Sequence, residues 1–239
     1  MNSVKYALEE GVATISMDDG RANIMTAELL RDLTTALERA RADKVAVLLR
    51  SDLPNTYSAG FDLKMFAARD AERSLEMVKA GGELIEAMVS FPGPIVAVAQ
   101  GHVFPMGLFT ILAADYRIGA DTGYQWGLNE VKIGIVPPLY AFKLIEARLR
   151  RNWCHRTLMS GEMYSPREAL DAGVFDELVP VLECDARARA VTAQLAGNPR
   201  EAFSGIKKRL KSNLAADLRS AISSEQTLAH YKDQLHTDR

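Results

Sequence analysis

The sequence predicts an α/β fold that continues into a helical C-terminal region. Strand-like and helix-like segments alternate through the N-terminal half, and helical patterns dominate after about Pro137. Alternation of this kind favours strands that are joined by right-handed helical crossovers. The composition, with 48% hydrophobic and 25% charged residues among 239, is that of an ordinary globular protein.

The first strand–helix–strand pattern runs from residue 12 to residue 50. Val12–Met17 and Val45–Arg50 have the character of strands, and the second is an apolar run typical of a strand that is buried on both faces. Between them, Thr26 is placed to cap a helix in which leucines recur at helical spacing. This segment therefore predicts one unit of an α/β core.

The same order recurs further along the chain. A helix predicted over Ser74–Val89 precedes a strand at Ile95–Ala99, and a helix at Gly107–Ala114 precedes a strand at Tyr116–Gly119. No repeat of fixed period is visible at the level of residue identity. The recurring pattern nevertheless favours successive strands that enter one core.

The C-terminal part is predicted to be mainly helical. Ser165 and Pro166 are typical of a helix start, and Gly173 is typical of the end of the same helix. A weak strand and two amphipathic stretches complete the pattern, at Asp176–Val179, Ala186–Ala196 and Pro199–Leu235. We expect residues 1–185 to form the α/β core, helix-rich after about 137, and residues 186–239 to form a helical region without a flexible linker.

Charge and cysteine content argue against several functional classes. Lys and Arg total 29 against 31 Asp and Glu, so a net charge of −2 offers no general attraction for nucleic acid or an anionic membrane. The N-terminal segment lacks the features of a targeting peptide, and no apolar run approaches the ~18–20 residues of a membrane span. Cys154 and Cys184 have neither CxxC nor zinc-ligand spacing. We expect a cytoplasmic protein with no membrane segment, disulfide or metal.

Two loops have the composition of an anion-binding turn. The first, Tyr57–Leu63, precedes a helix-compatible segment, so its amides are expected at a helix N-terminus, where N–H groups lack intrahelical partners. Gly60 allows the backbone to approach a ligand closely. The second, Gly101–Gly107, follows a predicted strand, and Pro105 suits the first helical turn. Either loop alone is more often structural, but together they predict an oxyanion hole with two converging N–H groups.

Five sequence runs, in this order, resemble the signatures of the crotonase (enoyl-CoA hydratase/isomerase) superfamily. They are YSAGFDL, PIVAVAQGHVFPMG, AADYRIGAD, WGLNEVKIGIVPP and SGEMYSPREALDAGVFDELVP. The resemblance implies a spiral of ββα units, a C-terminal trimerisation region over residues 186–239, and a homotrimer or a dimer of trimers. It also implies an acyl-CoA substrate, with coenzyme A as part of that substrate and no other cofactor.

The resemblance also implies roles for particular residues. The oxyanion donors would be the amides of Phe61 and Met106, and Glu130 would be the catalytic carboxylate. The surrounding residues implied to bind substrate are Ala22, Ala59, Gly60, Asp62, Leu63, Gly107, Phe109 and Asn129. Related hydratases resemble one another in using two glutamates, and the position of the earlier one is occupied here by Phe109.

A single carboxylate suffices for a different reaction, the shift of a double bond from C3–C4 to C2–C3. One base removes a proton from C2 and returns it at C4, while the thioester oxygen carries the negative charge. GLNE and the glycine of KIGI more specifically resemble delta-3, delta-2-enoyl-CoA isomerases of fatty-acid metabolism, including β-oxidation. The alternatives are a divergent hydratase, an acyl-CoA thioester hydrolase and a non-catalytic acyl-CoA-binding subunit.

Several charged residues have both a structural and a functional interpretation. Asp62 is better explained as a helix cap than as a catalytic acid, and His102 as a hydrogen-bonded structural residue. Candidate cations for the CoA phosphates are Arg21, Lys64 and the cluster Lys207, Lys208, Arg209 and Lys211. A charge run on a helix is otherwise a solvated face. We assign Arg148, Arg150 and Arg151 to surface or subunit contacts.

Overall fold

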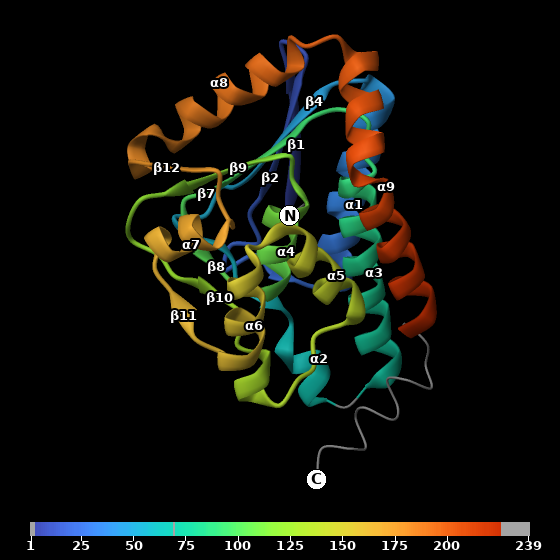
Figure 1. The fold of residues 1–239 in the computed structure, drawn as a ribbon, viewed down its shortest axis with the longest axis vertical. Coiled ribbons are helices and arrows are strands. Elements are labelled where there is room, and N and C mark those ends of the chain that lie inside the picture. The colour runs from blue at the N-terminus through green and yellow to red at the C-terminus, as the bar shows by residue number, and fades with distance from the viewer. Residues whose placement is uncertain (1–2, 69, 226–239) are drawn as a thin grey trace.

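The computed structural model describes residues 3–68 and 70–225 and shows two main sheets with helices packed around them (Figure 1). A six-stranded sheet has the strand order β1-β2-β4-β7-β9-β12, and a four-stranded sheet has the order β11-β10-β8-β5. The strands are β1 Val4–Glu9, β2 Val12–Met17, β3 Ile24–Met25, β4 Ala46–Ser51, β5 Asn55–Ser58, β6 Gly60–Phe61, β7 Ile95–Ala99, β8 Gly101–Val103, β9 Tyr116–Ala120, β10 Trp126–Gly127, β11 Met163–Tyr164 and β12 Glu177–Val179.

Successive pairs of strands alternate between the two sheets. β4, β7 and β9 each enter the six-stranded sheet, and β5, β8 and β10, which directly follow them, enter the four-stranded sheet. β4, β7 and β9 run parallel to one another in the first sheet, and β5, β8 and β10 run parallel to one another in the second. A helical segment then leads to the next pair, so the chain winds as a spiral of ββα units and confirms the predicted fold class.

The helices are α1 Ala27–Asp43, α2 Leu63–Ala67, α3 Ala71–Val89, α4 Pro105–Ala113, α5 Leu139–Arg148, α6 Arg151–Ser160, α7 Pro166–Ala172, α8 Cys184–Ala196 and α9 Arg200–Glu225, with 3-10 turns η1 Glu130–Ile133 and η2 Val181–Glu183. α8 lies on one side of the six-stranded sheet, and α1 and α3 lie on the other (Figure 1). α9 packs along α3 and α5. None of the helices within residues 3–68 and 70–225 is long and apolar enough to cross a membrane.

Helix caps explain where most elements begin and end. The Thr26 hydroxyl accepts a hydrogen bond from Leu29 N, as predicted for the start of α1. Ser165 and Glu168 form a reciprocal capping box at α7, which ends at Gly173 with φ +84°. α3 begins three residues before the predicted Ser74, because the Asp70 carboxylate accepts a hydrogen bond from Arg73 N.

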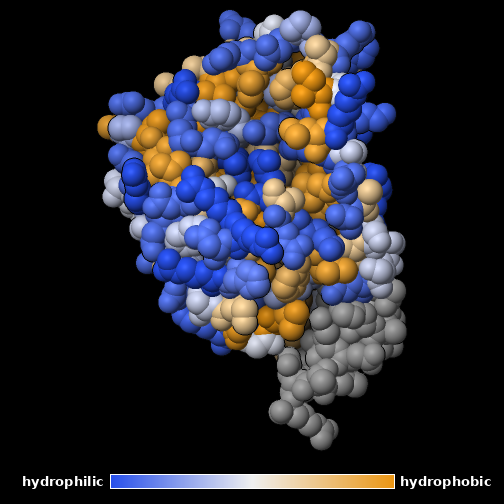
Figure 2. Space-filling view, viewed as in Figure 1, coloured by the Kyte–Doolittle hydropathy of each residue, from blue (hydrophilic) through white to orange (hydrophobic). Residues whose placement is uncertain are grey.

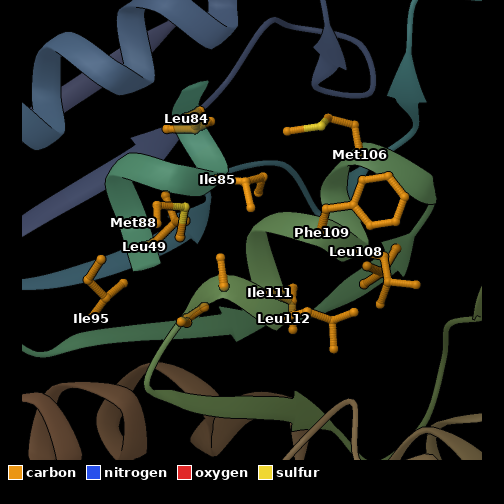
Figure 3. Close-up of a cluster of buried hydrophobic side chains, with 14 of the residues drawn as sticks. Leu49, Leu84, Ile85, Met88, Ile95, Met106, Leu108, Phe109, Ile111 and Leu112 are labelled. Carbon is orange, nitrogen blue, oxygen red and sulfur yellow. The ribbon is translucent and has the colours of Figure 1, made fainter. Parts of the chain in front are cut away.

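The hydrophobic core continues from the six-stranded sheet into α3 and α4. All five residues of β7 are buried, and so are Met106 to Ala113 of α4. Figure 3 shows Met106 and Phe109 on α4 near Ile85 of α3, with Leu49 and Met88 further along the same core. Helix α4 is therefore surrounded by other elements, which gives its first turn a fixed position.

Two predictions about surface cations are wrong. Lys207 and Lys211 are buried, and their Nζ atoms donate to the two carboxylate oxygens of Asp115 at 2.5 and 2.6 Å. These lysines hold α9 against the starts of β7 and β9, so they are not free to bind phosphate. Lys208 and Arg209 are exposed. Arg148 is also engaged inside the fold, where it donates to the carbonyls of Leu112 and Ala114.

The last helix, α9, is described as far as Glu225. The predicted continuation to Leu235 lies outside the described residues. Figure 2 shows hydrophobic surface interspersed among hydrophilic residues on the face that includes α9. Ile206 and Leu210 of this helix are 67% and 79% exposed. The assignment of residues 186–239 to trimerisation stays a prediction.

Candidate active site

Three candidate groups lie just beyond the ends of three neighbouring strands. β5 ends at Ser58, β8 at Val103 and β10 at Gly127. Phe61, Met106 and Glu130 each follow the last residue of their strand by three positions. β5 and β10 both pair parallel with β8, so their carboxyl ends meet at one edge of the sheet.

The first amide lies in a turn that only glycine adopts readily. Gly60 has φ +85°, and β6, formed by Gly60 and Phe61, pairs parallel with β3. Asp62 then caps α2, with its carboxylate accepting a hydrogen bond from Lys64 N at 3.0 Å. This confirms that Asp62 acts as a helix cap, and Phe61 N–H stands immediately before the helix.

The second amide is the first N–H of helix α4. Pro105 occupies the N1 position and has no N–H, so Met106 carries the first donor of the helix. The capping residue Phe104 makes no side-chain hydrogen bond to this end. N–H groups in a first turn have no intrahelical acceptor and lie at the positive end of the helix dipole. Met106 N–H is therefore suited to a negatively charged oxygen.

The two loops touch each other at these amides. A Cβ atom placed on Gly60 would lie 3.4 Å from the Pro105 nitrogen and 3.7 Å from the Met106 nitrogen. The Phe104 amide donates to the Ser58 carbonyl at 3.0 Å, which joins the loops by a backbone hydrogen bond. The structure thus brings together the two predicted oxyanion donors.

Glu130 is a buried carboxylate at the start of η1. It is 7% exposed, and its Oε2 has no hydrogen-bond partner among the described residues. Burial raises the pKa of Glu130 from 4.5 to about 7. Its backbone carbonyl accepts from Ile135 N and Gly134 N, which fixes the turn that presents the side chain. A carboxyl group with this pKa can both accept and release a proton near neutral pH.

An apolar cluster surrounds the two donor residues. Phe109 is fully buried and packs edge-on against Tyr140, with ring centroids 6.4 Å apart. A Cβ atom placed on Gly81 of α3 would lie 3.0 Å from Phe61 Cζ and 3.1 Å from Met106 Sδ. Both donor side chains therefore pack on α3, and this side of the site is hydrophobic.

The other predicted binding residues occupy the loops around the strand ends. The Ala22 carbonyl accepts a hydrogen bond from Ala59 N at 2.9 Å, so these two residues link the first loop to residues 19–24. Leu63 is 50% exposed at the start of α2, and Asn129 precedes Glu130 as the capping residue of η1. His102 Nδ1 accepts from Gln125 N, which agrees with its structural interpretation.

Three residues that support the first loop were missed by the sequence analysis. Asp19, Asn23 and Ser58 are linked by hydrogen bonds beneath Gly60. Asp19 and Asn23 lie at the two ends of the short segment 19–23, which contains Gly20, and Asp and Asn in such turns often bond to nearby backbone. That local signal was present, but the contact with Ser58 depends on tertiary structure.

The arrangement suits one class of reaction. Two neighbouring backbone N–H groups, together with a base of raised pKa that follows the adjacent strand, suit reactions in which proton removal places negative charge on a carbonyl oxygen. The enoyl-CoA hydratase/isomerase family model matches residues 7–238. The chain belongs to the enoyl-CoA hydratase/isomerase family and has the crotonase fold.

Some relatives of the chain are named isomerases and others hydratases. The chain is 30% identical over 211 residues to human mitochondrial enoyl-CoA delta isomerase 1, covering 87% of this chain and 70% of the relative. It is 27% identical over 219 residues to a probable enoyl-CoA hydratase of Bacillus subtilis (strain 168), covering 89% and 83%. It spans about two thirds of the length of the mammalian isomerases that it matches.

A solved structure gives the same assignment. An enoyl-CoA hydratase/isomerase family protein from Pseudomonas syringae superposes with a TM-score of 0.90 at 33% identity. The match covers 94% of this chain and 97% of that chain. Family and fold are thereby established, and the choice between isomerase and hydratase depends on the site.

Proposed function

We propose that the protein is an enoyl-CoA isomerase that shifts a C3–C4 double bond of an acyl-CoA thioester to C2–C3. The observation that carries this proposal is the pairing of one buried carboxylate, Glu130, with a fully buried Phe109 at the position where related hydratases have their other glutamate. A phenyl ring neither orients water nor transfers a proton. The site therefore has one acid/base group beside two amide donors.

In the proposed reaction Glu130 removes a proton from C2, which breaks the C–H bond and forms a dienolate. The thioester oxygen gains negative charge and accepts hydrogen bonds from Phe61 N–H and Met106 N–H. Glu130 then returns the proton at C4, which leaves the double bond at C2–C3 and regenerates the carboxylate. The pKa of about 7 suits both transfers, because the proton is neither too tightly nor too weakly held.

The surrounding residues support the binding of the substrate. Ala59, Gly60 and Gly107 allow close approach of the thioester, and Phe109 contributes to the hydrophobic wall that keeps water from the dienolate. Arg21 and Lys64 are exposed beside the first loop and are our candidates for binding the CoA phosphates. Exposed Ile206 and Leu210 support assembly into a homotrimer or a dimer of trimers.

A divergent hydratase is the second candidate, because the Bacillus subtilis relative is named a probable hydratase. The test is to supply 3-enoyl-CoA and 2-enoyl-CoA thioesters of several chain lengths in H₂¹⁸O. Product double-bond position is read by NMR and oxygen incorporation by mass spectrometry. We expect 2-enoyl-CoA from the first set and little ¹⁸O in either product. Efficient conversion of 2-enoyl-CoA into ¹⁸O-labelled 3-hydroxyacyl-CoA would contradict the proposal.

A further inference from the structure

We infer that Ser58 is a positioning residue that holds both amides of the proposed oxyanion hole in place. This inference rests on the use of that hole, which isomerisation and hydration share, and not on which of the two reactions the protein performs. Ser58 ends β5, is fully buried, and touches no reacting atom in our proposal. Its effect is exerted through Gly60 on one loop and through Phe104 and Gly107 on the other.

The Ser58 side chain controls the first loop. Its hydroxyl donates to the Asn23 carbonyl at 2.7 Å and accepts from Gly60 N at 3.1 Å. Gly60 has φ +85° and no side chain to limit its conformation, so the backbone at this point needs an external restraint. Holding Gly60 N–H in place restrains the peptide that follows it, which carries Phe61 N–H.

The Ser58 backbone and Cβ control the second loop. The Ser58 carbonyl accepts from Phe104 N at 3.0 Å, two residues before Met106. On the other side of Met106, a Cβ placed on Gly107 would lie only 2.6 Å from Ser58 Cβ. The second loop therefore packs on Ser58 from both sides of its donor, and there is no room for a larger residue at position 107.

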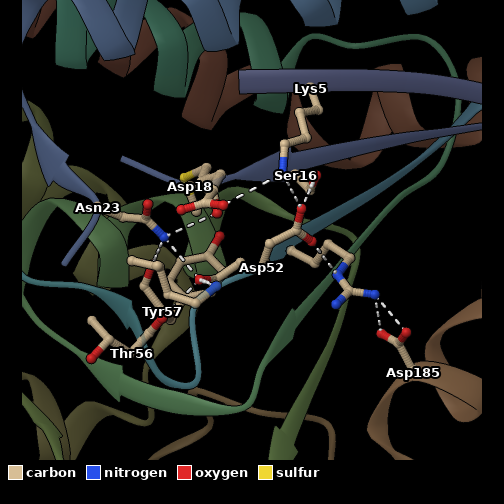
Figure 4. Close-up of polar contacts among 12 residues, drawn as sticks. Lys5, Ser16, Asp18, Asn23, Asp52, Thr56, Tyr57 and Asp185 are labelled. Atoms are coloured by element: carbon tan, nitrogen blue, oxygen red, sulfur yellow. Dashed lines mark hydrogen bonds and ion pairs between the residues drawn. The ribbon is translucent and has the colours of Figure 1, made fainter. Parts of the chain in front are cut away.

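Asn23 in turn holds Ser58 and its strand. The Asn23 side-chain amide donates to the carbonyls of Met17 and Tyr57 and to the Ser51 hydroxyl, at 3.3, 3.0 and 2.8 Å (Figure 4). These bonds join β2, β4 and β5 beneath the site. The residue that accepts from the Ser58 hydroxyl, Asn23, is thus anchored to the sheet through its side chain.

Asp19 completes the support. Its carboxylate accepts four backbone N–H bonds from residues 21–24, each 2.8 Å long. Burial opposes ionisation of Asp19, yet these donors leave its pKa below the ordinary value. The Asn23 carbonyl, which accepts the hydrogen bond from Ser58, therefore belongs to a rigid turn.

Loss of the Ser58 hydroxyl leaves Gly60 N–H buried without its acceptor and releases the first donor. Misplacement of a catalytic group by ~1 Å can cost on the order of 10² in rate, because the donor no longer meets the oxygen where charge develops. Binding of the CoA part does not depend on that donor. The effect is therefore expected in kcat and not in KM.

The experiment compares Ser58→Ala with Ser58→Cys and with the control Thr192→Val in the intact chain. Thr192 is a fully buried residue of α8, and its hydroxyl donates to the Ala188 carbonyl of the same helix at 2.7 Å. Each variant is assayed with 3-enoyl-CoA and, in D₂O, for exchange of the C2 protons of butyryl-CoA. Hydrogen exchange of the amides of residues 58–62 is measured in parallel.

Ser58→Ala should lower kcat and C2 exchange about 10- to 100-fold with KM changed less than about threefold. Its loop amides should exchange faster, Ser58→Cys should recover part of the loss, and Thr192→Val should stay within about threefold of wild type. Turnover and loop exchange in Ser58→Ala equal to those in Thr192→Val would overturn the inference.

The assays separate this inference from the proposed function. C2 exchange without isomerisation by the wild-type protein would contradict the isomerase, while the effect of Ser58→Ala on C2 exchange would still test the positioning role. If the wild type shows neither activity, amide exchange decides. Unchanged exchange at Gly60 and Phe61 in Ser58→Ala would then overturn the inference.

Discussion

Glu130 and Asp115 are both buried carboxylates, but their surroundings are opposite. Glu130 is 7% exposed and the Asp115 side chain 11%, so burial alone does not distinguish them. Asp115 accepts from Lys207, Lys211 and Ile95 N, whereas Glu130 Oε2 has no partner among the described residues. Burial raises the pKa of Glu130 to about 7, while at Asp115 the two lysines outweigh burial and lower it.

The difference separates a stabilising region from a reactive one. At Asp115 the fold neutralises the buried charge and fixes α9 to the sheet, so the carboxylate remains ionised. Glu130 forms no ion pair with a described residue, so its burial reduces the free energy of folding but leaves a proton acceptor available. We therefore expect substitutions at Glu130 to reduce activity and those at Asp115 to reduce stability.

Glu130→Gln should have the largest effect. Turnover of 3-enoyl-CoA should fall about 10²- to 10⁴-fold, because an amide of the same shape cannot accept the C2 proton. Steady-state kinetics and CoA-ligand titration measure this, and affinity should stay within a few-fold. Undiminished turnover in a purified, folded variant would remove Glu130 from the mechanism.

Asp115→Asn should act on stability. Two buried lysines would lose their shared counter-ion, which costs about 3–5 kcal/mol of unfolding free energy. Urea unfolding measures the change, with the exposed Asp171→Asn as the control, expected within about 0.5 kcal/mol of wild type. A loss no greater than that of the control would show that the lysines do not depend on Asp115.

Met106→Pro and Met106→Ala separate the amide from the side chain. Proline removes the N–H and should lower turnover about 10²- to 10³-fold, or about 2.7–4 kcal/mol of transition-state stabilisation. Alanine retains the N–H and should cost much less, mainly through packing against Gly81 and Tyr140. Circular dichroism and sizing must first show that both variants are folded and assembled. Equal losses in such samples would assign the effect to the side chain.

The pH dependence of stability should differ between wild type and Glu130→Gln. Because the folded pKa of Glu130 is about 7 against 4.5 in the unfolded chain, the folded state holds more protons between these values. This stabilising contribution is full below pH 4.5 and is lost as pH rises through 7. Relative to the variant, the wild type should lose at most about 3 kcal/mol across this range. Parallel urea curves at all pH values would contradict the raised pKa.

Local sequence signals predicted much of this fold because caps and strand periodicity act over a few residues. Thr26, Ser165 and Gly173 were correctly placed for that reason. β1 was not predicted, since it is an exposed edge strand with little apolar alternation. The family resemblance supplied the candidate site, and the strand ends brought its two amides together.

The errors involve partners that are distant along the chain. Lys207 and Lys211 have the sequence appearance of a solvated helix face, but Asp115 lies 92 and 96 residues away from them. Ser58 looked like an ordinary small residue because its partner Asn23 is 35 residues earlier. Single-sequence periodicity carries no information on such contacts, and only the tertiary structure shows them.

The most direct test of the account is a crystal structure of Glu130→Gln with a bound 3-enoyl-CoA. We predict that the thioester oxygen lies about 2.7–3.1 Å from both Phe61 N and Met106 N, with the residue 130 side chain against C2 and C4. Such a geometry would show that the three groups at the ends of β5, β8 and β10 act on one substrate. A thioester oxygen that meets neither amide, or a residue 130 side chain directed away from both carbons, would contradict the account.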